Sequence, residues 1–172
     1  DRRQSDRGRP GGDDPGESER RRSFRDELAG MIGLLYNTPC IAAWVPFNEG
    51  WGQFDSSEVA GYVKELDPTR SVDHASGWFE QGGGDYCSRH IYYLKLHRRR
   101  AWQENPAGRA FVISEFGAYG LQVPGSLWHP RRKFSIRYFK TPAALEDAYR
   151  SLLRYQLRPL IGNGLAGAVY TQ

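Results

Sequence analysis

Two apolar runs, each ending in a glutamate, constrain the fold of this chain more than any other feature. The first runs from Ile41 to Phe47 and is followed at once by Asn48 and Glu49. An apolar run without alternation predicts a strand buried on both faces, as in a parallel sheet. Polar side chains at the end of such a strand are typical of α/β barrels, whose active sites lie at the carboxyl ends of the strands.

The second run, from Ala110 to Gly117, repeats this pattern and contains Glu115. Three shorter segments also have strand character: Ser71–Asp73, His90–Tyr93 and Leu165–Tyr170. The sequence therefore predicts five strands.

Helices are expected between these strands. Apolar residues at helical spacing follow Ser23, a second helix starts with Asp55 as its N-cap, and a third starts with Thr141 as its N-cap. Pro159 is expected to kink or end the third helix. Strands alternating with helices indicate βα units around a parallel sheet.

The first 22 residues differ from the rest, because they contain no aliphatic or aromatic side chain apart from two prolines. Such a segment cannot bury enough surface to offset its ordering entropy. We expect a disordered tail or loop over 1–22, one folded region over 23–172, and an irregular loop over 119–140 within that region.

Charge and cysteine content argue against several classes of protein. The chain has 172 residues and a net charge of +4, and arginine clusters raise nucleic acid as a partner, but no nucleic-acid-binding motif accompanies them. We expect solvated surface and no nucleic-acid partner. No stretch reaches the roughly 18 apolar residues of a membrane span, so no membrane partner is expected. Cys40 and Cys87 make no disulfide framework, and Cys40 is expected to be a small buried residue.

Glu49 and Glu115 are the two carboxylates that end strong apolar runs. A pair of carboxylates facing one glycosidic bond is the standard equipment for sugar hydrolysis: one acid protonates the leaving oxygen and the other attacks the anomeric carbon. Aromatic residues near the strand ends suit stacking on a sugar; they are Trp44, Trp51, Trp78 and Tyr92. The alternative for either glutamate taken alone is a solvated or helix-capping role.

Several segments resemble glycoside hydrolase family 2, the β-galactosidase and β-glucuronidase family. Trp44–Gln53 (WVPFNEGWGQ) is similar to its acid/base segment, and Ile113–Gly120 (ISEFGAYG) to its nucleophile segment. Leu165–Gln172 (LAGAVYTQ) resembles its eighth barrel strand. The segments Asp67–Arg70 and Ala75–Trp78 also fit members of this group, and the resemblance covers Phe24 to Gln172.

The resemblance implies a role for each matched residue. Glu49 would be the general acid/base and Glu115 the nucleophile of a retaining mechanism. Asn48 would hydrogen-bond the sugar 2-hydroxyl, and Tyr92 would lie beside the nucleophile and orient it. His90 and Trp78 are candidates for lining the sugar site, with a core histidine and a packed indole as the alternatives.

The chain also departs from the family pattern. Arg89 and Tyr93 stand where Asp and Pro are usual, and Asn is commoner at the position of Asp73. The clamp that family glucuronidases place on a substrate carboxylate is not found after Glu115, which favours a neutral sugar. No ligand set for a metal is identifiable, so no cofactor is expected.

The fold implied by the resemblance is a partial (β/α)8 TIM barrel holding strands four to eight. A complete barrel needs eight strands in about 250 residues. Barrel strands one to three and the family's β-sandwich domains are therefore expected upstream, in a longer parent chain.

The function implied is that of a retaining exo-β-glycosidase, β-galactosidase-like, acting on a β-glycoside as its carbohydrate substrate. We expect this activity to be complete only in the parent chain, with the isolated fragment inactive. The alternatives are a barrel fragment that at most binds carbohydrate or serves as a scaffold, and an arginine-rich nucleic-acid binder.

Overall fold

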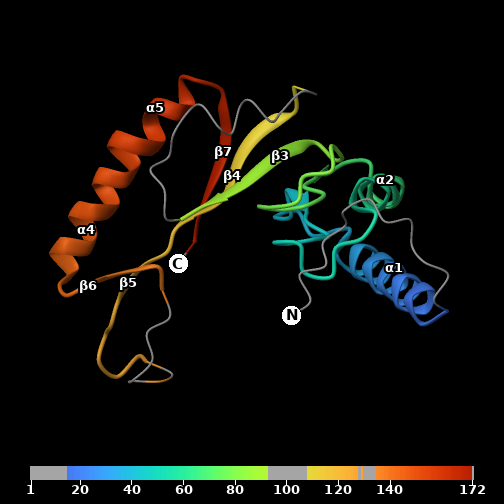
Figure 1. The fold of residues 1–172 in the computed structure, drawn as a ribbon, viewed down its shortest axis with the longest axis horizontal. Coiled ribbons are helices and arrows are strands. Elements are labelled where there is room, and N and C mark those ends of the chain that lie inside the picture. Colours follow the sequence, from blue (N-terminus) through green and yellow to red (C-terminus); the bar gives the residue numbers. More distant parts are fainter. Residues whose placement is uncertain (1–14, 93–107, 128, 130–134, 172) are drawn as a thin grey trace. The chain divides into compact units, whose positions relative to one another are not determined.

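The computed structural model describes residues 15–92, 108–127, 129 and 135–171, coloured along the sequence in Figure 1. The chain divides into two compact units, with the boundary between Ser88 and Arg89. Each unit is described by itself.

Among its described residues before β3, which starts at Tyr86, the first unit contains two helices and two short strands. Helix α1 spans Pro15–Leu35 and α2 spans Ser56–Leu66. Strands β1 (Ala43–Trp44) and β2 (Ser71–Val72) pair in parallel. The first apolar run therefore forms a short paired strand, followed by an isolated parallel bridge farther along.

Helix α1 begins eight residues before the expected start, so 15–22 is helical rather than a disordered tail. Charge pairing provides the physical reason. Arg20 and Arg21 both donate to Glu17, and Arg21 also donates to Asp55 at 2.6 Å, which ties the first turns of α1 to the start of α2. Residues 1–14 lie outside the described residues.

The core of the first unit lies under α1 and α2. Phe24 stacks on Phe47 with centroids 5.0 Å apart, and Phe54 meets both rings edge-on. The fully buried members of the cluster are apolar residues from α1, α2 and the β1–β2 pair: Ile32, Val59, Val63 and Val72. Helix α2 begins directly after Asp55, as predicted, but the Asp55 side chain makes no capping hydrogen bond and accepts from Arg21 instead.

The buried carboxylate of Asp67 stabilises this core through hydrogen bonds. Asp67 accepts hydrogen bonds from the indole of Trp44 at 2.9 Å, from Arg70 at 2.6 Å and from Thr69. Burial acts to raise the pKa of Asp67, but these hydrogen bonds outweigh it and hold the pKa well below its usual range. Trp44 is therefore a core residue bonded to Asp67, and the prediction that it stacks on a sugar is wrong.

Two burial predictions, one just before the first apolar run and one within it, are wrong. Cys40 is exposed, because it lies in the turn before β1. Val45 is 51% exposed, because β1 is paired only with β2 in the described structure and alternate side chains point away from the core.

The second unit is built on a sheet in the order β3-β4-β7. Strand β3 (Tyr86–Ile91) starts in the first unit, and its residues 89–91 belong to the second unit. Strands β4 (Ala110–Gly117) and β7 (Leu165–Thr171) pair in parallel. The predicted limits of β4 are confirmed. The strand expected over 90–93 instead ends at Ile91, and Tyr93 lies outside the described residues.

Two further strands were missed. Strands β5 (Tyr119–Leu121) and β6 (Arg137–Phe139) pair in parallel within the segment expected to be an irregular loop. Tyr119 packs against Phe139 with centroids 5.2 Å apart, and the guanidinium of Arg137 lies over both rings. Cross-strand aromatic contacts thus support a pair too short to show a clear period in the sequence.

One long helical stretch follows, and its N-terminus was predicted correctly. Helix α4 (Pro142–Ser151) is capped by Thr141, whose hydroxyl accepts from the Ala144 amide. It continues as a π-helix, η1 (Leu152–Leu157), and then as α5 (Arg158–Ile161). The wider π turns come just before Pro159, which has no N–H to donate, so the stretch changes helix type instead of ending there.

The pairs β1–β2, β4–β7 and β5–β6 are all parallel, and alternating strands and helices predict a parallel sheet. The partial barrel stays a prediction. None of the described helices is both long and apolar enough to cross a membrane.

Candidate functional site

The carboxylate of Glu115 lies on β4, two residues before the strand ends. Its neighbours Ile113 and Phe116 are buried, which fixes the strand, while the side chain of Glu115 keeps 28% of its surface exposed. The apolar run thus holds a half-buried acid on a rigid element, where its orientation is set by the sheet.

The phenol of Tyr92 donates a hydrogen bond to Oε2 of Glu115. Tyr92 directly follows the last residue of β3, and β3 lies beside β4 in the sheet. A hydrogen bond from a hydroxyl to an ionised carboxylate is among the stronger kinds in proteins. The contact therefore fixes the orientation of Glu115.

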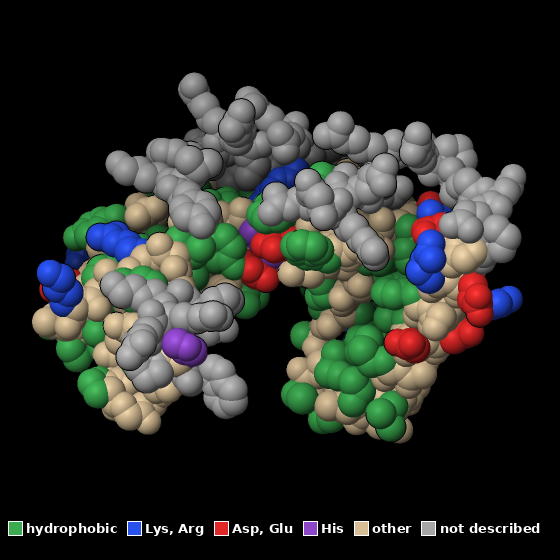
Figure 2. Space-filling view, turned by 60° about the horizontal axis from the view of Figure 1, so that its bottom comes forward, with side chains coloured by type: hydrophobic (Ala, Val, Ile, Leu, Met, Phe, Trp, Pro, Cys, Tyr) green, Lys and Arg blue, Asp and Glu red, His purple; other side chains and the backbone are tan. Residues whose placement is uncertain are grey.

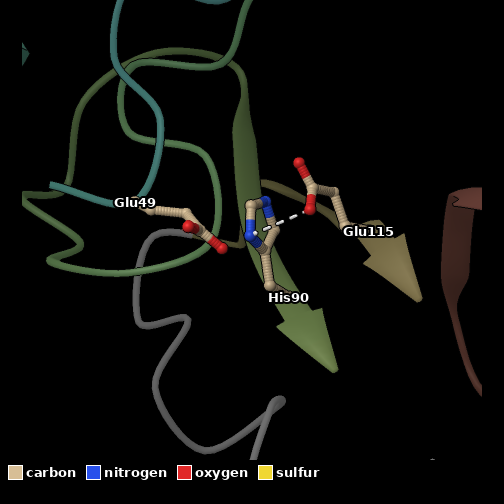
Figure 3. A group of neighbouring side chains, drawn as sticks. All are labelled: Glu49, His90 and Glu115. Carbon is tan, nitrogen blue, oxygen red and sulfur yellow. Dashed lines mark ion pairs between the residues drawn. The ribbon is translucent and has the colours of Figure 1, made fainter. Parts of the chain in front are cut away.

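His90 approaches the same carboxylate oxygen. Its Nδ1 lies 3.5 Å from Oε2 of Glu115, an ion-pair distance when the imidazole is protonated (Figure 3). The His90 side chain is fully buried and its ring meets that of Tyr92 edge-on, with centroids 6.2 Å apart. Residues two apart on an extended strand share a face, which explains why both side chains reach Glu115.

A third group contacts Tyr92 and was not singled out from the sequence. The hydroxyl of Thr171, the last residue of β7, lies 3.3 Å from the Tyr92 hydroxyl. The signal that could have found it is its place: it ends the final strand, as Glu115 comes near the end of β4.

The opposite face of β4 and β7 is held by aromatic packing. Tyr170 lies against Phe116, Tyr119 and Tyr149, with ring centroids 5.0 to 6.4 Å apart. Its hydroxyl accepts from the Tyr119 amide, and burial raises the pKa of Tyr170. Since Tyr170 precedes Thr171, this packing directs the Thr171 side chain toward the other face of the sheet.

In the first unit, Asn48 and Glu49 lie at a turn after the apolar run. Asn48 forms a parallel bridge with Ser76, and the Glu49 amide donates to the Ser76 carbonyl at 2.9 Å. Glu49 has a φ of 55°, and Gly50 follows with a φ of 75°. Left-handed backbone at a non-glycine residue is uncommon and clusters at functional sites.

Trp78 lies beyond Ser76 on the segment that pairs with Asn48, and it is 41% exposed. Its segment is held from the next residues: Gln53 donates to the Phe79 carbonyl at 2.9 Å, and the Gln81 amide donates to the imidazole of His74 at 3.0 Å. An exposed indole on a braced segment suits stacking on a ligand better than a packed core indole does.

Asp73 is a second buried acid in the first unit. Its Oδ1 accepts from the Ser88 hydroxyl at 2.8 Å. Desolvation by burial raises the pKa of Asp73, against the hydrogen bond from Ser88, which acts to lower it. The acid is therefore favoured in its neutral form more than an exposed aspartate is.

The structure thus brings Glu115, Tyr92 and His90 together in the second unit. Asn48, Glu49 and Trp78 belong to the first unit, on two segments bridged at Ser76. Asn48, Glu49 and Trp78 supply an amide, a carboxylate and an aromatic ring. Glu115 supplies the carboxylate that Tyr92 orients.

Comparison with known proteins finds similarity among solved structures. No protein-family model matches the chain, and no curated protein matches it. Among solved structures, the apo structure of Bacteroides uniformis beta-glucuronidase 3 is similar, with 22% sequence identity and a TM-score of 0.48. The similarity covers 87% of this chain and 22% of that chain, so this chain spans under a quarter of that protein's length.

Proposed function

We propose that this chain carries the two catalytic carboxylates of a retaining exo-β-glycosidase, β-galactosidase-like, which hydrolyses O-glycosidic bonds by double displacement. The observation that carries the proposal is the hydrogen bond from the Tyr92 hydroxyl to Glu115. It holds a half-buried carboxylate in one orientation, which is what an attacking group needs and a merely solvated acid does not have.

In the first step, an oxygen of Glu115 forms a bond to the anomeric carbon as the bond to the leaving oxygen breaks. Glu49 donates its proton to that leaving oxygen. In the second step, Glu49 takes a proton from water, the water oxygen bonds to the anomeric carbon, and Glu115 is released. Two inversions at one carbon give net retention.

The remaining site residues would bind the sugar. The amide of Asn48 would hydrogen-bond the 2-hydroxyl, a contact that strengthens in the transition state. Trp78 offers an exposed aromatic face, and His90 would line the site next to Glu115. The fold we propose is part of a (β/α)8 barrel completed in a longer chain, and activity would belong to that complete protein.

The test is hydrolysis of aryl β-glycosides by the complete protein and its variants. Glu115→Gln should lower kcat by at least about 10⁴-fold with every leaving group, because no nucleophile remains. Glu49→Gln should form the glycosyl-enzyme readily from a dinitrophenyl glycoside, whose leaving group needs no proton, but not from an alkyl glycoside.

Glu65→Gln is the matched control, because Glu65 is an exposed acid on α2. It should leave both rates unchanged. Equal losses in the Glu49 variant for both leaving groups would contradict the acid role. Full activity of the Glu115 variant would contradict the nucleophile role, and no hydrolysis by the unchanged complete protein would favour the non-catalytic carbohydrate-binding fragment instead.

A further inference from the structure

The Tyr92 hydroxyl lies between two oxygen atoms, but it has only one proton. It contacts Oε2 of Glu115 and, at 3.3 Å, Oγ1 of Thr171. An ionised carboxylate can only accept a hydrogen bond, so the Tyr92 proton goes to Glu115. The Thr171 hydroxyl can donate as well as accept, so it can donate to a lone pair of the Tyr92 oxygen.

Backbone contacts fix the position of Thr171 precisely enough for this role. Thr171 pairs with Gly117 in the parallel register, and its carbonyl accepts from the Ala118 amide at 2.9 Å. The preceding residue, Tyr170, is packed among aromatic rings on the other face of the sheet. The Thr171 hydroxyl is thus presented by a rigid strand, not by a loop.

We propose that Thr171 is a positioning residue for the nucleophile, acting through Tyr92. Its hydrogen bond directs the Tyr92 hydroxyl toward Glu115, so Thr171 on β7, Tyr92 at the end of β3 and Glu115 on β4 form one chain of hydrogen bonds that ends on the carboxylate. The inference rests on the proposed function, because it assigns Thr171 a part in the reaction of that same site.

The physical effect belongs to the chemical step. In a chain of hydrogen bonds each donor polarises the next, so donation by Thr171 strengthens donation by Tyr92 to the carboxylate. Without it, the phenol can rotate away and the carboxylate samples orientations that cannot attack. Since Thr171 touches Tyr92 rather than the substrate, its loss should change kcat and leave KM nearly the same.

The test uses two substitutions at Thr171 in the complete protein. Thr171→Val keeps the shape but removes the hydroxyl, and should lower kcat about tenfold with KM within about twofold of its original value. Thr171→Ser keeps the hydroxyl and should restore kcat to within about threefold. A serine variant as slow as the valine variant would overturn the proposal, since the hydroxyl would then not account for kcat.

Coupling to Tyr92 provides the second readout. In a background of Tyr92→Phe, Thr171→Val should have no further effect on kcat, because the group through which it acts is gone. If the double variant instead loses kcat by the product of the two single losses, the proposal is overturned. Thr141→Val is the control: it removes a threonine hydroxyl from the same unit and destabilises the cap of α4, but should leave kcat unchanged.

The two levels of proposal fail in different ways. If a fluorosugar inactivator does not label Glu115 in the unchanged protein, the proposed function is wrong and the role of Thr171 is overturned with it. If Glu115 is labelled but Thr171→Val keeps full kcat, the function stands and only the role of Thr171 is wrong.

Discussion

The proposed chemistry depends on a single hydroxyl group, that of Tyr92, which donates to Glu115. Tyr92→Phe removes one oxygen atom and leaves the ring in place beside His90. We expect kcat to fall about 100-fold, because the nucleophile loses the donor that orients it. Tyr155→Phe, which alters an exposed tyrosine on η1, should have no effect. Equal activity of the two variants would show that the contact with Glu115 is not used.

Asp73 allows a prediction about stability at the scale of one residue. A pKa raised on folding means that the folded chain binds the proton more tightly than the unfolded chain does. The contribution of Asp73 to stability is then greatest at low pH and is lost as pH rises through the folded pKa. Asp73→Asn cannot ionise but can still accept from Ser88, so it should raise the unfolding midpoint by a few degrees at pH 7.

This gain should shrink as pH falls, because Asp73 is then neutral as well. Thermal unfolding followed by circular dichroism between pH 4 and 8 measures the difference, and Asp147→Asn serves as an exposed control on α4. A variant less stable than the unchanged chain at pH 7 would contradict the account.

The role of a residue could be predicted only where a chemically reactive side chain stands at a recognisable position, such as the end of a strand. The sequence indicated Glu115, Tyr92 and His90, which the sheet of the second unit holds within contact distance. It missed Thr171, because a threonine at a strand end has no pattern of its own. It also misplaced Trp44, since an indole bonded to a buried carboxylate cannot be told from a ligand-stacking indole by spacing.

At the scale of elements, Gly117 makes the sharpest prediction. It has a φ of 89°, and a Cβ there would lie 2.3 Å from the ring of Tyr170. Gly117→Ala should lower the free energy of unfolding by about 2–4 kcal/mol, through backbone strain and overpacking together. It should also reduce activity, because the displaced ring moves the end of β7.

Gly125→Ala is the matched control, because Gly125 has a φ of 85° but nothing within 4 Å of the added atom. It should cost only about 1–2 kcal/mol, the backbone strain alone. Chemical denaturation of both variants gives the comparison. Equal losses would mean that Tyr170 yields without cost, so its packing would not fix Thr171.

Elements were predictable where a strong local signal agreed with the packing. The run over 110–117, the helix start after Asp55 and the cap at Thr141 had such signals, and the structure confirms β4, the start of α2 and the start of α4. The early turns of α1 combine local pairs of Glu17 with Arg20 and Arg21 with a distant pair between Arg21 and Asp55. The β5–β6 pair depends on ring contacts between residues far apart in the sequence. No local pattern indicates the distant contacts.

At the scale of the whole molecule, several large apolar side chains remain at the surface, and Figure 2 draws hydrophobic side chains in green. Val169 is 57% exposed on β7, which is an outer strand of its described sheet. An outer strand with exposed apolar residues is prone to pair with another chain. We therefore expect the 172-residue chain to self-associate.

Sizing with light scattering tests this expectation. Val169→Lys should shift the population toward the monomer, while Val123→Lys, at a residue 50% exposed outside any strand, should not. A monomeric chain that melts in one cooperative transition would contradict the expectation, and with it one reason for proposing a barrel completed elsewhere.

The most direct measurement of the central claim is covalent trapping of the nucleophile. The complete protein is incubated with 2-deoxy-2-fluoro-β-glycosyl fluorides, digested, and its peptides analysed by mass spectrometry. The account predicts one added fluorosugar on the peptide that contains Glu115, and none in the Glu115→Gln variant. A fluorosugar attached to any other residue, with Glu115 unmodified, would contradict it.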